Sequence, residues 1–186
     1  MTIQEAREIY LKSDCSHFIM CTNYYSSYIQ YKRQEISKEQ EIIWKKEKVR
    51  MLSLEIRKTG DYRIFNRLYD ITEEFHNYEY LQLLFDTLKR IRKPITADQS
   101  VCVAETILGR KAAKNRSGLI YWAYDIGQKA IAIVLMDQVL EFLHHPDLSD
   151  EKLEKQIRRL RRLCKNIILE LELNFSGKYL KHYYNF

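Results

Sequence analysis

The fold is decided by residues 149–171, which read SDEKLEKQIRRLRRLCKNIILEL. Apolar side chains recur in this segment at alternating steps of four and three, the spacing that gathers them on one face of an α-helix. The pattern predicts a long helix, capped at its start by Ser149 or Asp150, with a heptad-like apolar seam. The seam consists of Leu153, Ile157, Leu160, Cys164, Ile167 and Leu171.

Helical patterns of this kind fill most of the chain, because residues that break helices are scarce. Only five Gly and two Pro occur among 186 residues, and turns, hairpins and phosphate-binding loops are built from these residue types. Three capping boxes predict helix starts, and they are Thr2 with Glu5, Ser37 with Gln40, and Thr96 with Gln99. We therefore predict an all-α, single-domain bundle of six to eight helices with short loops over residues 1–186, ending in an aromatic tail at 177–186.

Further helix boundaries are predicted between these caps. A second helix is expected from Ser13 or Asp14 to about Gln34, and the helix that starts after Thr96 is expected to reach about residue 113. Residues 61–93 carry apolar steps of three and four, which predict either one helix of about 30 residues or two helices broken near Asn77. Residues 119–143 are the most apolar segment, and we interpret them as one central helix.

Several classes of protein are disfavoured by the sequence. No apolar run approaches the roughly 18 residues that a membrane span requires, and the N-terminal residues do not resemble a signal peptide. The four cysteines have no CxxC spacing and are typical of a reducing compartment. No GxxxxGK[ST], GxGxxG, GxSxG or HExxH motif occurs. We expect a cytoplasmic protein without a cofactor and favour a non-enzyme, although a catalytic site assembled from distant residues stays open.

The strongest local signal is a basic one. The chain has a net charge of +6, and residues 155–165 contain six cations. Five of them fall opposite the apolar seam and form what we call the basic stripe: Lys155, Arg158, Arg159, Arg162 and Lys165. Such a stripe can follow the phosphates of a nucleic acid or bind an acidic protein. The alternative is a solvated face, supported by ion pairs of Glu151 with Lys155 and of Glu154 with Arg158.

Tyrosine is the unusual residue in the composition, with 14 copies. Tyr24, Tyr28 and Tyr31 share one face of the predicted second helix. Tyrosines can anchor a protein interface or stack on nucleic-acid bases. They can also lie at the boundary of the core with the hydroxyl in water. These three residues are therefore candidate interface aromatics.

Two Glu-x-x-His pairs, Glu73 with His76 and Glu141 with His144, raise the question of a metal site. Carboxylate-bridged di-metal bundles use two such pairs and two further Glu residues, and Glu41 and Glu105 stand at suitable places in the order. The helical phase argues against this arrangement, because the apolar stripe places Glu73 on the outward side of its helix. No metal site is therefore predicted, and the four residues of the two pairs are kept as an alternative.

The sequence favours a non-enzymatic binding or regulatory protein that contacts another macromolecule, a protein or a nucleic acid, through helix faces. The first alternative is an RNA- or DNA-binding protein that uses the basic stripe. The second is an enzyme built as a carboxylate-bridged di-metal helical bundle. Homodimerisation is a further hypothesis, in which a second copy pairs through five residues of the apolar seam: Leu153, Ile157, Leu160, Ile167 and Leu171.

Overall fold

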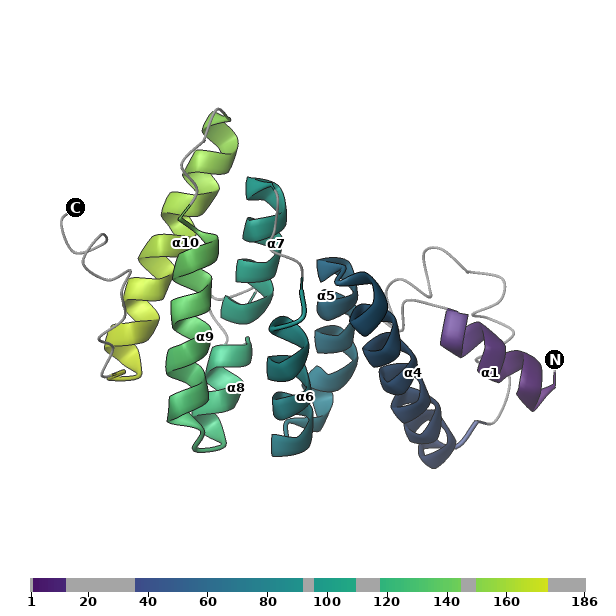
Figure 1. The fold of residues 1–186 in the computed structure, drawn as a ribbon. Coiled ribbons are helices and arrows are strands. Elements are labelled where there is room, and N and C mark those ends of the chain that lie inside the picture. The colour runs from purple at the N-terminus through teal and green to yellow at the C-terminus, as the bar shows by residue number, and fades with distance from the viewer. Residues whose placement is uncertain (1, 13–35, 92–95, 110–117, 145–149, 174–186) are drawn as a thin grey trace. The chain divides into compact units, whose positions relative to one another are not determined.

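The computed structural model describes residues 2–12, 36–91, 96–109, 118–144 and 150–173. These residues form eight α-helices, one short 3-10 helix and their connections, with no β-strand among them (Figure 1). The prediction of an all-α fold with six to eight helices is thus confirmed. Residues 13–35 and 174–186 lie outside the described ranges, and with them the predicted second helix, its three tyrosines and the aromatic tail. The described residues divide into two compact units, Met1–Phe75 and His76–Phe186. The single-domain organisation stays a prediction.

The first unit is built around one long helix. It contains α1 (Ile3–Lys12), α4 (Lys38–Thr59), α5 (Tyr62–Thr72) and the 3-10 helix η1 (Glu73–Phe75). Helix α4 packs against both α1 and α5. Two of the predicted capping boxes start helices here. The Thr2 hydroxyl accepts from the Glu5 N–H at 3.2 Å, and the Ser37 hydroxyl accepts from the Gln40 N–H at the same distance.

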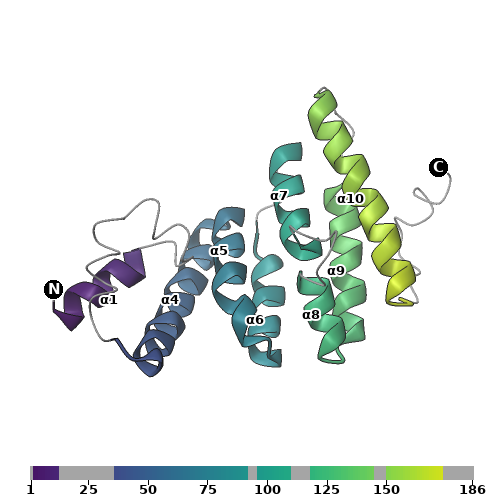
Figure 2. The same cartoon turned by 180° about the vertical axis from the view of Figure 1, so that it is seen from behind.

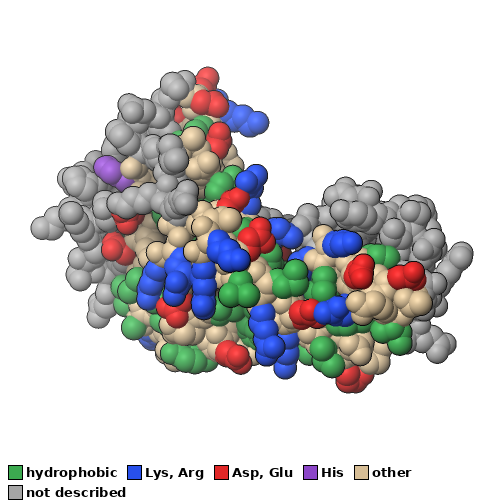
Figure 3. Space-filling view, turned by 45° about the vertical axis from the view of Figure 1, so that its right-hand side comes forward, with side chains coloured by type: hydrophobic (Ala, Val, Ile, Leu, Met, Phe, Trp, Pro, Cys, Tyr) green, Lys and Arg blue, Asp and Glu red, His purple; other side chains and the backbone are tan. Residues whose placement is uncertain are grey.

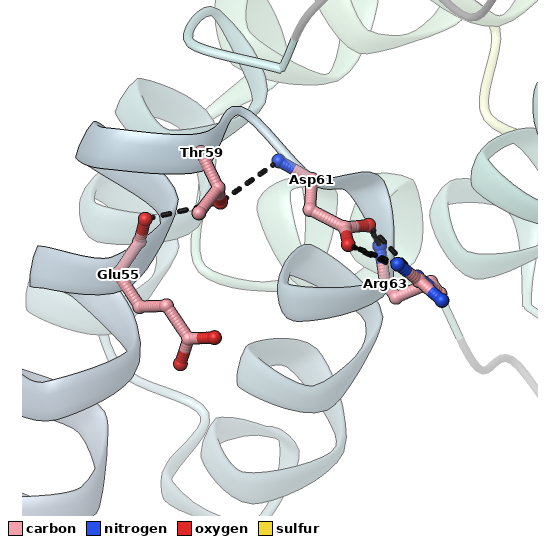
Figure 4. A network of polar contacts seen from close by, with 4 residues as sticks. All are labelled: Glu55, Thr59, Asp61 and Arg63. Atoms are coloured by element: carbon pink, nitrogen blue, oxygen red, sulfur yellow. Dashed lines mark hydrogen bonds and ion pairs between the residues drawn. The ribbon is translucent and has the colours of Figure 1, made fainter.

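The turn between α4 and α5 shows how local sequence sets the path of the chain (Figure 4). Gly60 ends α4 in the left-handed conformation, with φ of 63°, and its N–H donates to the Ile56 carbonyl at 2.8 Å. Asp61 then caps α5, accepting from the Arg63 N–H at 2.9 Å and from the Arg63 guanidinium at 2.6–3.1 Å. The Thr59 hydroxyl receives the Asp61 N–H at 3.2 Å, so the turn satisfies its own polar groups.

We expect Asp61→Ala to destabilise the first unit by about 1 kcal/mol at neutral pH, because the orphan N–H of Arg63 loses its acceptor. Hydrogen bonding from Arg63 holds the pKa of Asp61 below its ordinary value. A depressed folded-state pKa contributes stability above the unfolded pKa of about 3.9 and loses it as the pH falls through the folded value. The difference between wild type and variant should therefore narrow in acid.

Urea titrations between pH 7 and pH 2 measure this difference. Asp61→Asn is the matched control, because asparagine caps a helix about as well as aspartate but carries no charge. It should lose less stability than the alanine variant at pH 7. A difference between wild type and Asp61→Ala that grows in acid would contradict the assignment.

The described residues of the second unit form five helices, whose arrangement is drawn from the reverse side in Figure 2. They are α6 (Tyr78–Leu88), α7 (Ala97–Leu108), α8 (Leu119–Asp125), α9 (Lys129–Phe142) and α10 (Glu151–Glu170). Helix α7 packs against α8, α9 and α10, and α8 packs against both α6 and α9. The prediction that Thr96 caps a helix is confirmed, since its hydroxyl accepts from the Gln99 N–H at 3.3 Å.

The prediction of one central helix over residues 119–143 is wrong. The segment forms two helices, α8 and α9, that pack against each other after a turn at 126–128. Gly127 makes this turn with φ of 79°, a left-handed conformation that glycine adopts without strain. The Gln128 N–H donates back to the Ala123 carbonyl at 2.8 Å. The expected burial is found on the packed sides, where Ala123, Ala132 and Leu135 have no exposed surface.

Two other helix boundaries are decided by the structure. Of the alternatives for residues 61–93, the broken one is correct: His76 has φ of 40°, and the Asn77 side chain caps α6 by accepting from the Tyr80 N–H at 3.0 Å. Helix α7 ends at Leu108, earlier than the predicted end near residue 113. Gly109 stops it with φ of 94°, a conformation that does not continue a helix.

Candidate binding surface on α10

The seam of α10 faces the interior of its own unit, where α10 packs against α7 and α9. Asp150 caps the helix by accepting from the Lys152 N–H at 2.8 Å. Five of the six seam residues are buried, and Leu153 at the start is partly buried. The predicted apolar seam is therefore part of the core. Buried residues of the seam are Ile157, Leu160, Cys164, Ile167 and Leu171.

Polar contacts with neighbouring elements help to hold the rotation of α10. Arg161 is the cation of residues 155–165 that does not belong to the basic stripe, and it donates to the Leu143 carbonyl at 2.7 Å. This carbonyl follows the C-terminal end of α9, where orphan acceptors remain and positive charge is favourable. Near the other end of α10, Glu170 accepts from the Tyr121 hydroxyl of α8 at 2.8 Å. The seam is thereby fixed inward and the basic stripe outward.

All five cations of the basic stripe are exposed, as the helical phase predicts. Lysine and arginine side chains are also seen to gather in groups on the face of the molecule drawn in Figure 3. Because the stripe spans residues 155–165 at a rise of 1.5 Å per residue, it is about 15 Å long. It presents charge to solvent along two to three helical turns.

Carboxylates partly neutralise the stripe. The two predicted ion pairs are formed: Lys155 contacts Glu151 at 2.7 Å, and Arg158 contacts Glu154. A third pair, which the sequence did not reveal, joins Arg159 to Glu105 of α7 at 3.0 Å. Exposed pairs of this kind contribute about 0.2–1 kcal/mol and are screened by salt, so they leave the cations available for exchange to a better acceptor.

Arg162 differs from its neighbours in the stripe. Within the part of the chain that the structure describes, no hydrogen bond or ion pair is found for its guanidinium. Glu105 also receives the Gln156 amide at 3.1 Å, so the carboxylate of α7 is already shared between two donors of α10. Among the described residues, a ligand would therefore break no hydrogen bond or ion pair to reach Arg162.

The four residues of the di-metal alternative lie in different local surroundings. Glu73 is exposed, His76 stacks on Trp122 with ring centroids 5.0 Å apart, and Glu141 and His144 are exposed on and just after α9. Among the described residues, no three His, Cys, Asp or Glu side chains are arranged to hold a metal ion. The di-metal alternative thus gains no support from the described part of the chain.

The two described cysteines differ in environment. Burial raises the pKa of the Cys164 thiol to about 12, which keeps it protonated and unreactive at neutral pH. Cys102 is exposed on α7. The interpretation of Cys164 as a small hydrophobic residue in the seam is consistent with this burial, while Cys15 and Cys21 lie outside the described residues.

The fold and the basic stripe define an all-α protein with an exposed cationic helix face. Comparison with protein-family models, with curated proteins and with solved structures found no match to this chain. None of the described helices is both long enough and apolar enough to cross a membrane.

Proposed function

We propose that this chain is a non-enzymatic binding protein that contacts another macromolecule through exposed helix faces, and that the basic stripe of α10 is one of these faces. The observation that carries the proposal is the placement of five cations on the solvent side of a helix whose apolar side is buried. Such a face favours an acidic partner. A cytoplasmic location is part of the proposal.

Pulldowns from the native host test this proposal, with nuclease-treated and untreated lysates compared. The proposal is supported if the wild type retains a partner and the triple variant Arg158→Glu, Arg159→Glu, Arg162→Glu does not. A partner that is still retained from the nuclease-treated lysate is a protein that does not bind through nucleic acid. Turnover of a substrate by the purified chain, lost on mutation of a single residue, would overturn the non-enzymatic assignment.

The second candidate function is binding of RNA or DNA along the same stripe. Neutralisation of up to five phosphates would give a slope of log affinity against log salt no steeper than about −4.5 for duplex DNA. The three ion pairs already present in the stripe make a shallower slope more consistent with this geometry. Binding of this kind is modest at physiological salt.

We expect the triple variant Arg158→Glu, Arg159→Glu, Arg162→Glu to abolish a salt-sensitive gel shift with RNA or DNA, because it reverses the charge of three of the five cations. The control is the triple variant Lys46→Glu, Arg50→Glu, Arg57→Glu on α4, which changes the net charge of the protein by the same amount and should keep the gel shift. Nucleic-acid binding that survives in the α10 variant would contradict this candidate function.

Homodimerisation through the seam also stays a hypothesis. The seam is covered by α7 and α9 of the same chain, so a second copy would have to displace them. Sedimentation at low protein concentration measures the mass directly. A value equal to one chain of 22.5 kDa would count against a dimer.

A further inference from the structure

A second exposed face, on α4, combines apolar and cationic side chains and was not predicted from the sequence. Ile43 and Leu54 are 56% and 57% exposed, and Met51 beside them is 48% exposed. Single exposed apolar side chains are common on protein surfaces, but a cluster of large ones is typical of an interaction site. We call this surface the outer face of α4; it consists of Ile43, Lys46, Arg50, Met51, Leu54 and Arg57.

The outer face is continuous along the helix. From Ile43 to Arg57 its central residues are separated by steps of three, four, four and three, which places them on one line of an α-helix. At 1.5 Å per residue this line is about 21 Å long. The opposite side of α4 is apolar as well, and it is buried in the first unit through Trp44, Leu52 and Ile56. Helix α4 is thus apolar on both sides, although its inward side alone is buried by the chain.

The cations of the outer face have no partner among the described residues. Within the described ranges, Lys46, Arg50 and Arg57 take part in no ion pair, hydrogen bond or ring contact. This distinguishes the outer face from the basic stripe of α10, in which Arg158 and Arg159 are paired with carboxylates. Lys46 and Arg50 stand four residues apart, a spacing at which like charges weaken a helix slightly. Helix stability therefore does not account for the pattern.

We propose that the outer face of α4 docks an acidic amphipathic helix of a partner protein. This inference rests on the proposed function and names a surface and a partner for it. The apolar residues would receive the apolar stripe of the partner, and its flanking carboxylates would meet Lys46, Arg50 and Arg57. Groove-like pairing of this kind uses anchors at helical spacing, which is the spacing of Ile43, Arg50 and Leu54.

A lipid surface fits this face less well. A helix that lies in a membrane interface buries a broad apolar side and keeps its cations on the polar side. Here Arg50 stands on the central line between Ile43 and Leu54, so insertion of the apolar residues would carry a charge into the lipid. A carboxylate of a partner helix can instead pair with Arg50 where it stands.

The test uses the full chain and a synthetic helical peptide with Leu at the a and d heptad positions and Glu at the flanking positions. Fluorescence anisotropy measures its affinity. We expect the wild type to bind and two variants to lose at least about tenfold in affinity: Leu54→Asp, and the triple reversal Lys46→Glu, Arg50→Glu, Arg57→Glu. Circular dichroism checks that these exposed substitutions leave the helices intact, and Ile43→Ala is a milder variant that removes only an apolar anchor.

Two controls separate this inference from the proposed function. A peptide with Lys in place of Glu should not bind. Charge reversal of three exposed cations outside both faces, Lys58→Glu with Arg90→Glu and Lys152→Glu, should leave binding of the Glu peptide as in the wild type. Binding that is lost in the α10 variant and kept in the α4 variants would overturn the inference and leave the proposed function standing. Failure of the wild type to bind the peptide would also overturn it, as would binding of the α4 face to phosphatidylserine vesicles without peptide binding. The lysate pulldowns judge the proposed function separately.

Discussion

Replacing Gly118 with alanine is expected to lower the free energy of unfolding by roughly 3–5 kcal/mol, through backbone strain and overpacking together. Gly118 is buried with φ of 115°, a conformation that residues with a side chain rarely adopt. An added Cβ would lie 2.5 Å from the carbonyl carbon of Leu108 and 2.6 Å from the nitrogen of Gly109. Both atoms are backbone at the end of α7, so no side chain can rotate away to make room.

Gly127→Ala is the matched control for this effect. Gly127 also has a positive φ, of 79°, but an added Cβ would meet nothing within 4 Å. Only the strain of the left-handed conformation remains, about 1–2 kcal/mol. Urea denaturation of both variants and the wild type measures the two losses. Equal losses at Gly118 and Gly127 would show that the close approach of α7 and α8 at Gly118 contributes nothing.

The features predicted correctly from the sequence are those set by neighbours along the chain. A capping box needs two residues three positions apart, and the caps at Thr2, Ser37 and Thr96 all form as predicted. The seam of α10 was predicted for the same reason, because a strong periodic pattern leaves one choice of buried side. Because the basic stripe lies opposite the seam on the same helix, its exposure was predicted together with the burial of the seam.

The errors have a different physical origin. Gly127 sits in an apolar segment, where hydrophobic periodicity hides a turn that depends on a single left-handed residue. The contact of Gly118 with Leu108 and the ion pair of Arg159 with Glu105 join residues that only tertiary packing brings together. Sequence periodicity carries no information about such pairs.

The outer face of α4 was missed because a helix with apolar residues on both sides gives two stripes. Periodicity places Ile42, Val49, Leu52 and Ile56 on one stripe. The last three are buried, but Ile42 is 40% exposed, so periodicity alone does not separate the two sides. Exposure in the folded chain is the signal that separates them: Trp44 is 1% exposed and Ile43 is 56% exposed, although they are adjacent in sequence.

The second prediction with a large expected effect concerns Trp44, the buried neighbour of Ile43. We expect Trp44→Ala to destabilise the first unit by roughly 3–5 kcal/mol, the usual range for removal of a buried aromatic side chain. Trp44 packs in a small cluster with Ala6 and Tyr10, and its ring centroid is 5.7 Å from that of Tyr10. Within the described residues, the other apolar side chains packed against this cluster are the partly buried Ile9, Leu11 and Ile36, so these would have to move inward to fill the cavity.

Loss of Trp44 should also loosen α1 in particular. Among the described residues, α1 would then be held by its partly buried apolar side chains Ile9 and Leu11. Two polar contacts would add to them, namely the ion pair of Arg7 with Glu47 and the bond from the Lys48 ammonium to the Leu11 carbonyl. The Arg7–Glu47 pair is partly buried but still reached by solvent, so it contributes about 1 kcal/mol or less. Buried Lys48 becomes more hydrated once the aromatic cluster opens. Amide hydrogen exchange should therefore accelerate first across α1.

Ile43→Ala, one residue away on the same helix, is the control that separates an effect on stability from an effect on binding. Because Ile43 is exposed, its truncation should change the free energy of unfolding by no more than about 0.5 kcal/mol. The same substitution should weaken binding of the acidic helical peptide, since Ile43 is an anchor of the outer face of α4. The two sides of α4 would then be separated, with Trp44 serving the fold and Ile43 serving the interface. A large stability loss for Ile43→Ala would instead mean that the outer face is covered by the chain itself, and would contradict its assignment as a docking surface.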